Sequence, residues 1–298
     1  MAQNRQDMGS GPVKPLLLQL MIPAVVAQVV NLLYNIVDRI YIGHIAGIGA
    51  AALTGVGLFT PILMLLNAFA MLVGAGGAPR TAIALGQGDR QQAEKIVSNS
   101  FTVLMFFAVV LTIGFYAGAP VLLRLFGASD ATLPYALSYS RIYIAGSVFV
   151  LVVLGMNPFI TTQGFAKTSM LTTVIGAVIN IILDPILIFG FGLGVRGAAI
   201  ATVASQVVSA VLTVRCIHGS QGMPWHLQLK NIRIERSVLL AICRIGLPGA
   251  AQSALYSISN MTIQSAINGF GTVAVAAWSV YGLSLIHISE PTRPEPIS

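Results

Sequence analysis

The chain has 298 residues, of which 56% are hydrophobic and only 8% are charged. Because soluble domains carry about 25% charged residues, this composition excludes an ordinary soluble protein. The net charge is +7, but the basic residues lie between hydrophobic stretches and form no stripe. We therefore expect a lipid bilayer, and not nucleic acid, as the partner. The two cysteines have no metal-ligand spacing and make no disulfide framework.

Long windows without charge locate the predicted membrane helices, since about 20 apolar residues are needed to cross a bilayer. Four windows free of Asp, Glu, Lys and Arg each hold one helix: residues 15–37, 96–123, 142–166 and 197–214. A further helix is predicted from about Ala50 to Gly76, after a turn at Gly43–Gly49. Residues 168–195 hold a helix with one charge. Residues 245–289 hold a seventh helix, a turn near Gly269–Thr272 and the start of an eighth.

Basic residues between these windows predict the orientation. If the amino terminus is cytoplasmic, eleven bases lie on the inner side: Arg5, Lys14, Arg80, Arg90, Lys95, Lys167, Arg215, Lys230, Arg233, Arg236 and Arg244. The outer side then carries only four: Arg39, Arg124, Arg141 and Arg196. Bases concentrate on the cytoplasmic side of membrane proteins, so the amino terminus is predicted to lie inside.

The fifth predicted helix contains the stretch IGAVINIILDPILIF, in which Asn180 and Asp184 are four residues apart. On a helix this spacing places both side chains on one face. A carboxylate in hydrocarbon is costly, and such acids usually face a bundle interior or a watery cavity. Pro185 follows and favours a kink beside the acid. We interpret the stretch as an ion site, against the alternative of an acid kept only for helix packing.

Asp38 and Thr202 are further candidates for this site. At 1.5 Å per residue, Asp184 lies about 25 Å along its helix from Lys167, in the outer half of the membrane. Asp38 lies near the outer end of the first helix, with Tyr34 and Asn35 about one turn earlier. Asp38 is either a second site carboxylate or an interfacial acid. The Thr202 hydroxyl is either a cation ligand or bonded to its own helix.

Two other segments carry recognisable patterns. Gly192, Gly194 and Gly197 spell G-x-G-x-x-G, but they join two apolar helices and no acid follows at the required distance, so we expect no nucleotide. A tight outer turn with close helix approach explains these glycines better. The polar segment from Arg215 to Arg244 alternates bases with Leu and Ile, which suits an amphipathic linker on the inner membrane surface.

A weak internal repeat appears when the chain is shifted by 225 residues. Six identities then align in 35 positions: Pro23 with Pro248, Asn35 with Asn260, Ile42 with Ile267, Ala51 with Ala276, Ala52 with Ala277 and Gly57 with Gly282. They align the first two helices with the seventh and eighth. Six helices separate the copies, so both copies cross the membrane in the same direction, as a parallel repeat does.

These features together resemble the multidrug and toxic compound extrusion (MATE) family, as a bacterial member. The matching motifs are YNIVD with Pro23 upstream, LGQGD at Leu85–Asp89, NIILDP at Asn180–Pro185 and GAAIATVASQ at Gly197–Gln206. The resemblance implies two six-helix bundles and export of amphipathic, often cationic drugs across the cytoplasmic membrane in exchange for Na⁺ or H⁺. The implied cation site consists of Asp38, Asn180, Asp184 and Thr202, which would be the ligands if the ion is Na⁺. Tyr34 and a fourth-helix tyrosine, Tyr139, would lie beside it, and Pro23 and Pro185 would kink their helices.

The expected fold is an all-α membrane protein. A first bundle spans residues 1–214, a cytoplasmic amphipathic linker 215–244, and the first part of a second, parallel-repeat bundle 245–282. Residues 283–298, LSLIHISEPTRPEPIS, resemble a translated sequencing adapter, so we expect a non-native tail after an incomplete second bundle. We expect a monomer with no cofactor apart from the coupling ion.

Three alternatives to an efflux antiporter stay open. A lipid-linked sugar flippase has a similar architecture, but such proteins favour basic cavities and the predicted spans contain no internal Lys or Arg. A membrane enzyme would need a catalytic constellation, and the four histidines lie outside the predicted spans: His44, His218, His226 and His287. We therefore expect no enzyme. The third alternative is a fragment that does not transport.

Overall fold

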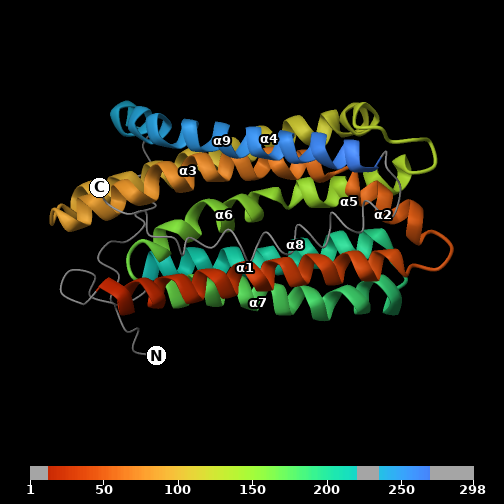
Figure 1. Cartoon of the computed structure of the whole chain (residues 1–298), viewed down its shortest axis with the longest axis horizontal. Coiled ribbons are helices and arrows are strands. Elements are labelled where there is room, and N and C mark those ends of the chain that lie inside the picture. The colour runs from red at the N-terminus through yellow and green to blue at the C-terminus, as the bar shows by residue number, and fades with distance from the viewer. Residues whose placement is uncertain (1–12, 220–234, 269–298) are drawn as a thin grey trace. The chain divides into compact units, whose positions relative to one another are not determined.

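The computed structural model describes residues 13–219 and 235–268, and within these ranges every regular element is a helix (Figure 1). In chain order the helices are α1 (Val13–Gly43), α2 (Gly49–Gly57), α3 (Thr60–Gly86), α4 (Arg90–Leu125), α5 (Leu133–Ala145), α6 (Ser147–Thr161), α7 (Ala166–Pro185), the π-helix η1 (Ile186–Gly190), α8 (Val195–Gly219) and α9 (Arg236–Asn268). The chain divides into two compact units, 1–251 and 252–298, and the first contains the site. The predicted turn at Gly269–Thr272, the eighth helix and the tail lie outside the described residues.

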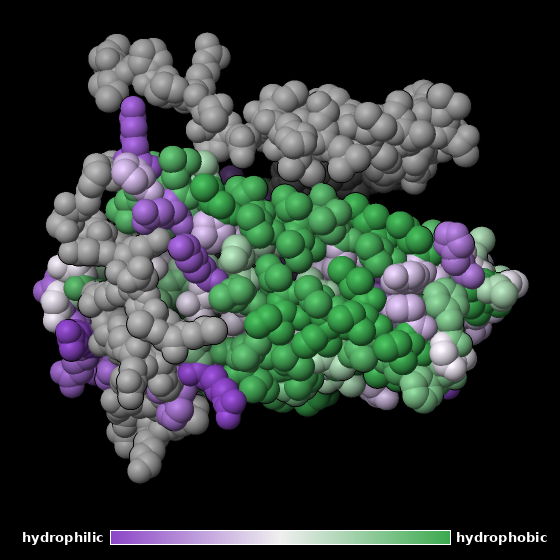
Figure 2. All heavy atoms as spheres, turned by 90° about the horizontal axis from the view of Figure 1, so that it is seen from below, coloured by the Kyte–Doolittle hydropathy of each residue, from purple (hydrophilic) through white to green (hydrophobic). Residues whose placement is uncertain are grey.

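The described helices are those of a multi-pass membrane protein, which confirms the predicted fold class. Five stretches are long and apolar enough to cross a membrane, or six if the bent pair α5 and α6 forms one span. Figure 2 shows hydrophobic residues gathered in a broad band with hydrophilic residues at both ends of it. Large apolar side chains are also exposed elsewhere on the described helices, among them Val121 at 72% and Leu125 at 77%. Such exposure is expected where the surrounding solvent is lipid.

The second predicted helix, Ala50 to Gly76, is wrong in its bounds. The structure has two helices there, α2 and α3, separated at Leu58 and Phe59, and α3 continues to Gly86. Pro61 lies in the first turn of α3, where its missing N–H costs no intrahelical hydrogen bond. Apolar composition alone does not reveal such a break, because both helices are strongly hydrophobic.

The fourth predicted helix, residues 142–166, is also corrected. It begins earlier, at Leu133, and bends by 56° between α5 and α6. The bend is at Gly146, where an added Cβ would lie 2.4 Å from Val203 of α8. Only glycine allows α8 to approach this closely, so the bend is a packing feature that a hydropathy pattern cannot show.

The predicted linker at 215–244 has helical ends. Residues up to Gly219 continue α8, and α9 already begins at Arg236, before the predicted start at 245. The remaining segment, 220–234, lies outside the described residues, so its amphipathic character stays a prediction. In α1 the helix continues through Pro23, which is buried, and the kink expected there is likewise a prediction.

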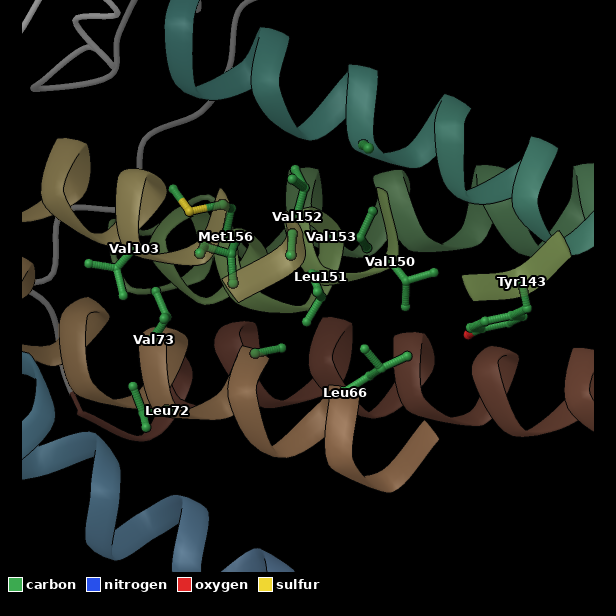
Figure 3. Close-up of a cluster of buried hydrophobic side chains, with 14 of the residues drawn as sticks. Leu66, Leu72, Val73, Val103, Tyr143, Val150, Leu151, Val152, Val153 and Met156 are labelled. Carbon is green, nitrogen blue, oxygen red and sulfur yellow. The ribbon is translucent and has the colours of Figure 1, made fainter. Parts of the chain in front are cut away.

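The apolar core lies where α3, α4 and α6 meet. Leu66 and Val73 of α3 and Leu151 and Met156 of α6 are almost or fully buried, and Figure 3 shows them in one cluster. On its other face α6 packs against α8, which packs against α7, which in turn packs against α1. This arrangement places α1, α7 and α8 side by side, and these three helices carry the four predicted cation ligands, while Tyr139 lies on α5.

Candidate functional site

Asn180 and Asp184 of α7 form the centre of the site. Both side chains are fully buried, and the Asn180 amide Nδ2 donates a hydrogen bond to Asp184 Oδ1 over 3.2 Å. The four-residue spacing therefore places them on one inward face, as the sequence predicts. Of the salt bridges among described residues, Lys95–Glu235 and Arg124–Asp130, neither involves Asp184. A buried acid without a basic partner does not act as one half of a structural ion pair.

Pro185 changes the helix directly after the acid. The α-helix ends at Pro185 and the π-helix η1 follows, with the Phe191 N–H bonded to the Ile186 carbonyl at 2.9 Å. Proline removes a donor from the regular ladder, and single π turns of this kind are frequent at functional sites. The expected disruption at Pro185 takes the form of this change in helix type.

Asp38 lies within α1 and not at its end, because the helix continues to Gly43. Its side chain is only 8% exposed. The carboxyl groups of Asp38 and Asp184 are close enough to interact electrostatically. The interpretation of Asp38 as a solvated interfacial acid therefore does not fit the structure. The fold brings together two acids that are far apart in the sequence.

Three tyrosines lie in the neighbourhood of Asp38. Tyr34, Tyr139 and Tyr143 all lie within electrostatic range of its carboxyl group. Tyr139 and Tyr143 stack on each other with ring centroids 5.9 Å apart. Tyr143 was not among the predicted site residues, although its position one helical turn after Tyr139 is a signal that could have found it.

Thr202 adopts one of the two states that its sequence context allowed, the bond to its own helix, and its role as a cation ligand stays a prediction. Its hydroxyl donates to the Ala198 carbonyl at 2.9 Å, the common bond of a membrane threonine to its own helix. It also shares a side-chain hydrogen bond with Tyr139. The residue is 5% exposed, so it belongs to the buried polar group.

Three oxygens of the site have no hydrogen-bond partner among the described residues: Asp38 Oδ1, Asn180 Oδ1 and Asp184 Oδ2. Buried polar atoms are nearly always satisfied, so each exception needs an explanation. Carboxylate and amide oxygens are ligands that hard cations prefer, and a carboxylate also accepts a proton. We call Asp38, Asn180 and Asp184 the acid site.

A cavity of about 550 Å³ adjoins the acid site, with Tyr34, Tyr143 and Asn180 in its wall. Amide and hydroxyl side chains from α1, α6, α7 and α8 make up much of the lining. None of the described residues that line it is Lys, Arg, Asp or Glu. Asn35 is exposed and lines this cavity, with its amide bonded to the Asn31 carbonyl at 2.7 Å. The structure thus places Asn35 in the cavity lining, which does not include Asp38 or Asp184.

A second polar group lies in the same bundle and was not predicted. Thr172 and Thr213 donate to Asn157 Oδ1 at 3.2 and 3.4 Å, and Asn157 Nδ2 donates to Thr173 at 3.4 Å. Ser209 donates to the Thr172 carbonyl at 3.0 Å. We call these five residues the Asn157 cluster. The spacing of Thr202, Ser205, Ser209 and Thr213 along α8 is the sequence signal that a polar face exists there.

The glycines of the G-x-G-x-x-G pattern form a turn, as the sequence analysis favours. Gly192 and Gly194 have φ angles of 64° and 55°, in the left-handed region that favours glycine. A Cβ on Gly197 would lie 2.7 Å from the Leu187 backbone, so glycine allows α8 to contact η1 closely.

Helices long enough to span a membrane, a pair of buried acids and an adjoining polar cavity are typical of helical membrane transporters. Comparison with known proteins narrows this class. The family model described as MatE matches residues 23–186, and the chain belongs to the multidrug and toxic compound extrusion family.

The chain is similar to the probable multidrug resistance protein YoeA of Bacillus subtilis, with 26% identity over 277 residues that cover 91% of this chain and 59% of the relative. It is 24% identical over 283 residues to the multidrug export protein MepA of Staphylococcus aureus, covering 94% and 61% of the two chains. Among solved structures, an outward-facing MATE transporter matches with a TM-score of 0.84 and 29% identity, covering 93% and 62%.

A transporter of the MOP superfamily from Pyrococcus furiosus, whose reversed pocket polarity is taken to indicate a different function, matches with a TM-score of 0.83 and 29% identity over 93% and 61% of the chains. The chain thus spans about 60% of the length of these relatives.

Proposed function

We propose that this chain belongs to a multidrug exporter of the cytoplasmic membrane and carries the site that couples export to H⁺ or Na⁺. The observation that carries the proposal is the acid site, in which two buried carboxyl groups interact electrostatically, neither takes part in a salt bridge among the described residues, and three oxygens are unpaired. The names of the bacterial relatives support drug export. The amino terminus is proposed to be cytoplasmic, on the basis of the eleven inner and four outer bases.

Coupling follows from electrostatics. Two carboxylates that share a buried site repel each other, so binding one cation or proton relieves an unfavourable charge. The loaded and unloaded sites then favour different packing of α1 against α7, and the disrupted helix after Pro185 gives α7 room to adjust. An ion that binds two conformations unequally shifts the equilibrium between them. This shift is the proposed drive for releasing drug to the outside.

The proposed substrates are amphipathic compounds, often cationic. The cavity lining supports this class, because it offers neutral amides and hydroxyls, carries no Lys or Arg and adjoins two acids. A lipid-linked sugar flippase is the second candidate, because its architecture is similar. An anionic pyrophosphate headgroup would favour a basic cavity, which the described lining does not provide.

The test measures efflux of a cationic dye from vesicles under an imposed H⁺ or Na⁺ gradient. Because the chain spans about 60% of its relatives, residues 1–251 are grafted in place of the matching part of the Bacillus subtilis relative. Efflux that requires one of the two gradients is expected. Efflux of a lipid-linked sugar and not of the dye would favour the flippase, and no movement of either would contradict the proposal.

A further inference from the structure

Helices α3 and α9 touch backbone to backbone at two glycines. A Cβ on Gly246 of α9 would lie 2.0 Å from the Leu72 carbonyl oxygen of α3. A Cβ on Gly76 of α3 would lie 2.4 Å from the Ile242 carbonyl oxygen of α9. No side chain larger than hydrogen fits at either position without moving a helix. Figure 3 shows Leu72 on the side of α3 nearest to α9.

The two contacts are reciprocal, since each helix contributes one glycine and one carbonyl four residues away. Gly246 meets Leu72 and Gly76 meets Ile242, so the helices run in opposite directions. Small residues at a helix interface let membrane helices approach closely, with weak Cα–H···O contacts between them. Val238 and Ile242 are buried on the same part of α9, at 5% and 0% exposed.

Asn99 of α4 fixes the start of α9. Its side chain is 3% exposed, and its Oδ1 accepts a hydrogen bond from the Glu235 backbone N–H at 2.7 Å. Its Nδ2 donates to the Lys95 carbonyl at 3.0 Å, which orients the amide. The first N–H groups of a helix lack intrahelical partners, so this bond caps α9 from another helix. The Lys95–Glu235 ion pair is 3.8 Å long and about half exposed, so it adds little.

We propose that the α3–α9 glycine crossing, capped by Asn99, closes the inner end of the transport path and opens in every export cycle. This inference rests on the proposed function, which places Gly76, Asn99 and Glu235 on the cytoplasmic side. Alternating access requires a contact on that side that forms in one state and breaks in the other. A crossing built on glycines has few interlocking side chains to separate, and the partly buried hydrogen bond from Glu235 to Asn99 restores its register when it closes.

Cross-linking tests whether the contact opens. In the grafted protein with Cys216→Ala and Cys243→Ala, the pair Asn99→Cys and Glu235→Cys is oxidised to a disulfide across the cap. Efflux is expected to fall below about a tenth of the parental rate and to return on reduction, because a locked state cannot be exchanged for the other. The control pair is Thr112→Cys and Ser147→Cys, whose hydroxyls lie 2.9 Å apart between α4 and α6. It should leave efflux unchanged.

Undiminished efflux of the locked protein would overturn the closure while leaving the proposed function intact. Failure of the pair to cross-link would overturn the contact itself. If the unlocked grafted protein moves no substrate, the proposed function fails, and the inference that rests on it fails too.

A second measurement, independent of transport, tests the crossing. Asn99→Cys is labelled from the inner side with a membrane-impermeant maleimide in the complete 298-residue chain. Gly246→Ala should raise the labelling rate by about tenfold or more, because the added methyl group forces α9 away from Leu72. Gly249→Ala is the matched control on the same helix, where a Cβ meets nothing within 4 Å. Equal labelling rates in the two variants would contradict the inference that the α3–α9 crossing shields position 99 from solvent.

Discussion

The acid site and the Asn157 cluster lie in one bundle and share α7, yet they differ in how their polar atoms are satisfied. In the Asn157 cluster both amide atoms of Asn157 bond to threonine hydroxyls, and Ser209 bonds to the α7 backbone. In the acid site three buried oxygens have no partner among the described residues. Both are polar groups within apolar helices, so hydropathy alone does not distinguish them.

The difference indicates separate roles. A polar group whose bonds are closed among its own members holds helices in register, and removing a member costs stability. A group with unpaired acceptors can bind an ion or a proton through them, and removing a member lowers the affinity for that ion or proton. The following predictions test this division, beginning with the largest expected effect.

Asp184→Asn removes one of the two acids while keeping the shape of the side chain. The rate of efflux with the ion gradient, divided by the rate without it, should fall to about 1. In the parent this ratio should be roughly 5 to 150, the range that coupling free energies of 1–3 kcal/mol give. The protein should still insert, because a neutral amide in hydrocarbon costs less than a carboxylate. The readout is dye efflux from vesicles. Parental ion dependence in this variant would remove the acid site from the mechanism.

Asp38→Asn should abolish ion dependence to the same degree, since the two carboxyl groups act as one site. The double variant should then be no worse than either single variant, as expected for residues that function as a unit. Additive losses in the double variant would mean that the two acids belong to separate sites. The measurement is the same vesicle assay with all three variants side by side.

Asn157→Ala should lower the free energy of unfolding by roughly 1–2 kcal/mol, since it leaves Thr172 and Thr213 without their shared acceptor. Ion dependence of efflux should persist. The melting temperature in detergent is the measurement, and Asn67→Ala, an exposed amide on the same cavity, is the control. Loss of ion dependence with unchanged stability would reverse the assigned roles.

Asn180→Ala removes both a donor to Asp184 and an unpaired oxygen. We expect the ion concentration for half-maximal efflux to rise about tenfold, the equivalent of one lost hydrogen bond of about 1.4 kcal/mol. Maximal efflux should be kept at saturating ion. An unchanged ion requirement would show that Asn180 only supports α7.

Thr202→Val should have the smallest effect, a rise of roughly threefold in the ion requirement, because much of its hydroxyl's bonding is to its own helix. Thr202→Ser keeps the hydroxyl and should match the parent. If valine and serine behave alike, the hydroxyl takes no part in ion binding.

The sequence by itself identified the class of fold and the centre of the site. Charge-free windows revealed the membrane helices because the bilayer demands long apolar segments, whatever their partners. The spacing of Asn180 and Asp184 predicted their contact because residues four apart always share a helix face. Both inferences depend only on the residues of a single helix and not on which other helices it contacts.

Only the tertiary structure decided which helices meet. Asp38 interacts electrostatically with Asp184, Tyr143 lies within electrostatic range of Asp38, Asn157 bonds to threonines of two other helices, and Gly246 packs against Leu72. It also placed the bend at Gly146, which depends on α8 approaching from elsewhere in the chain. Such pairings arise from packing between segments far apart in sequence. In the amino-acid sequence, a polar residue on the inward face of a helix gives the same pattern whether its partner is another helix, an ion or neither.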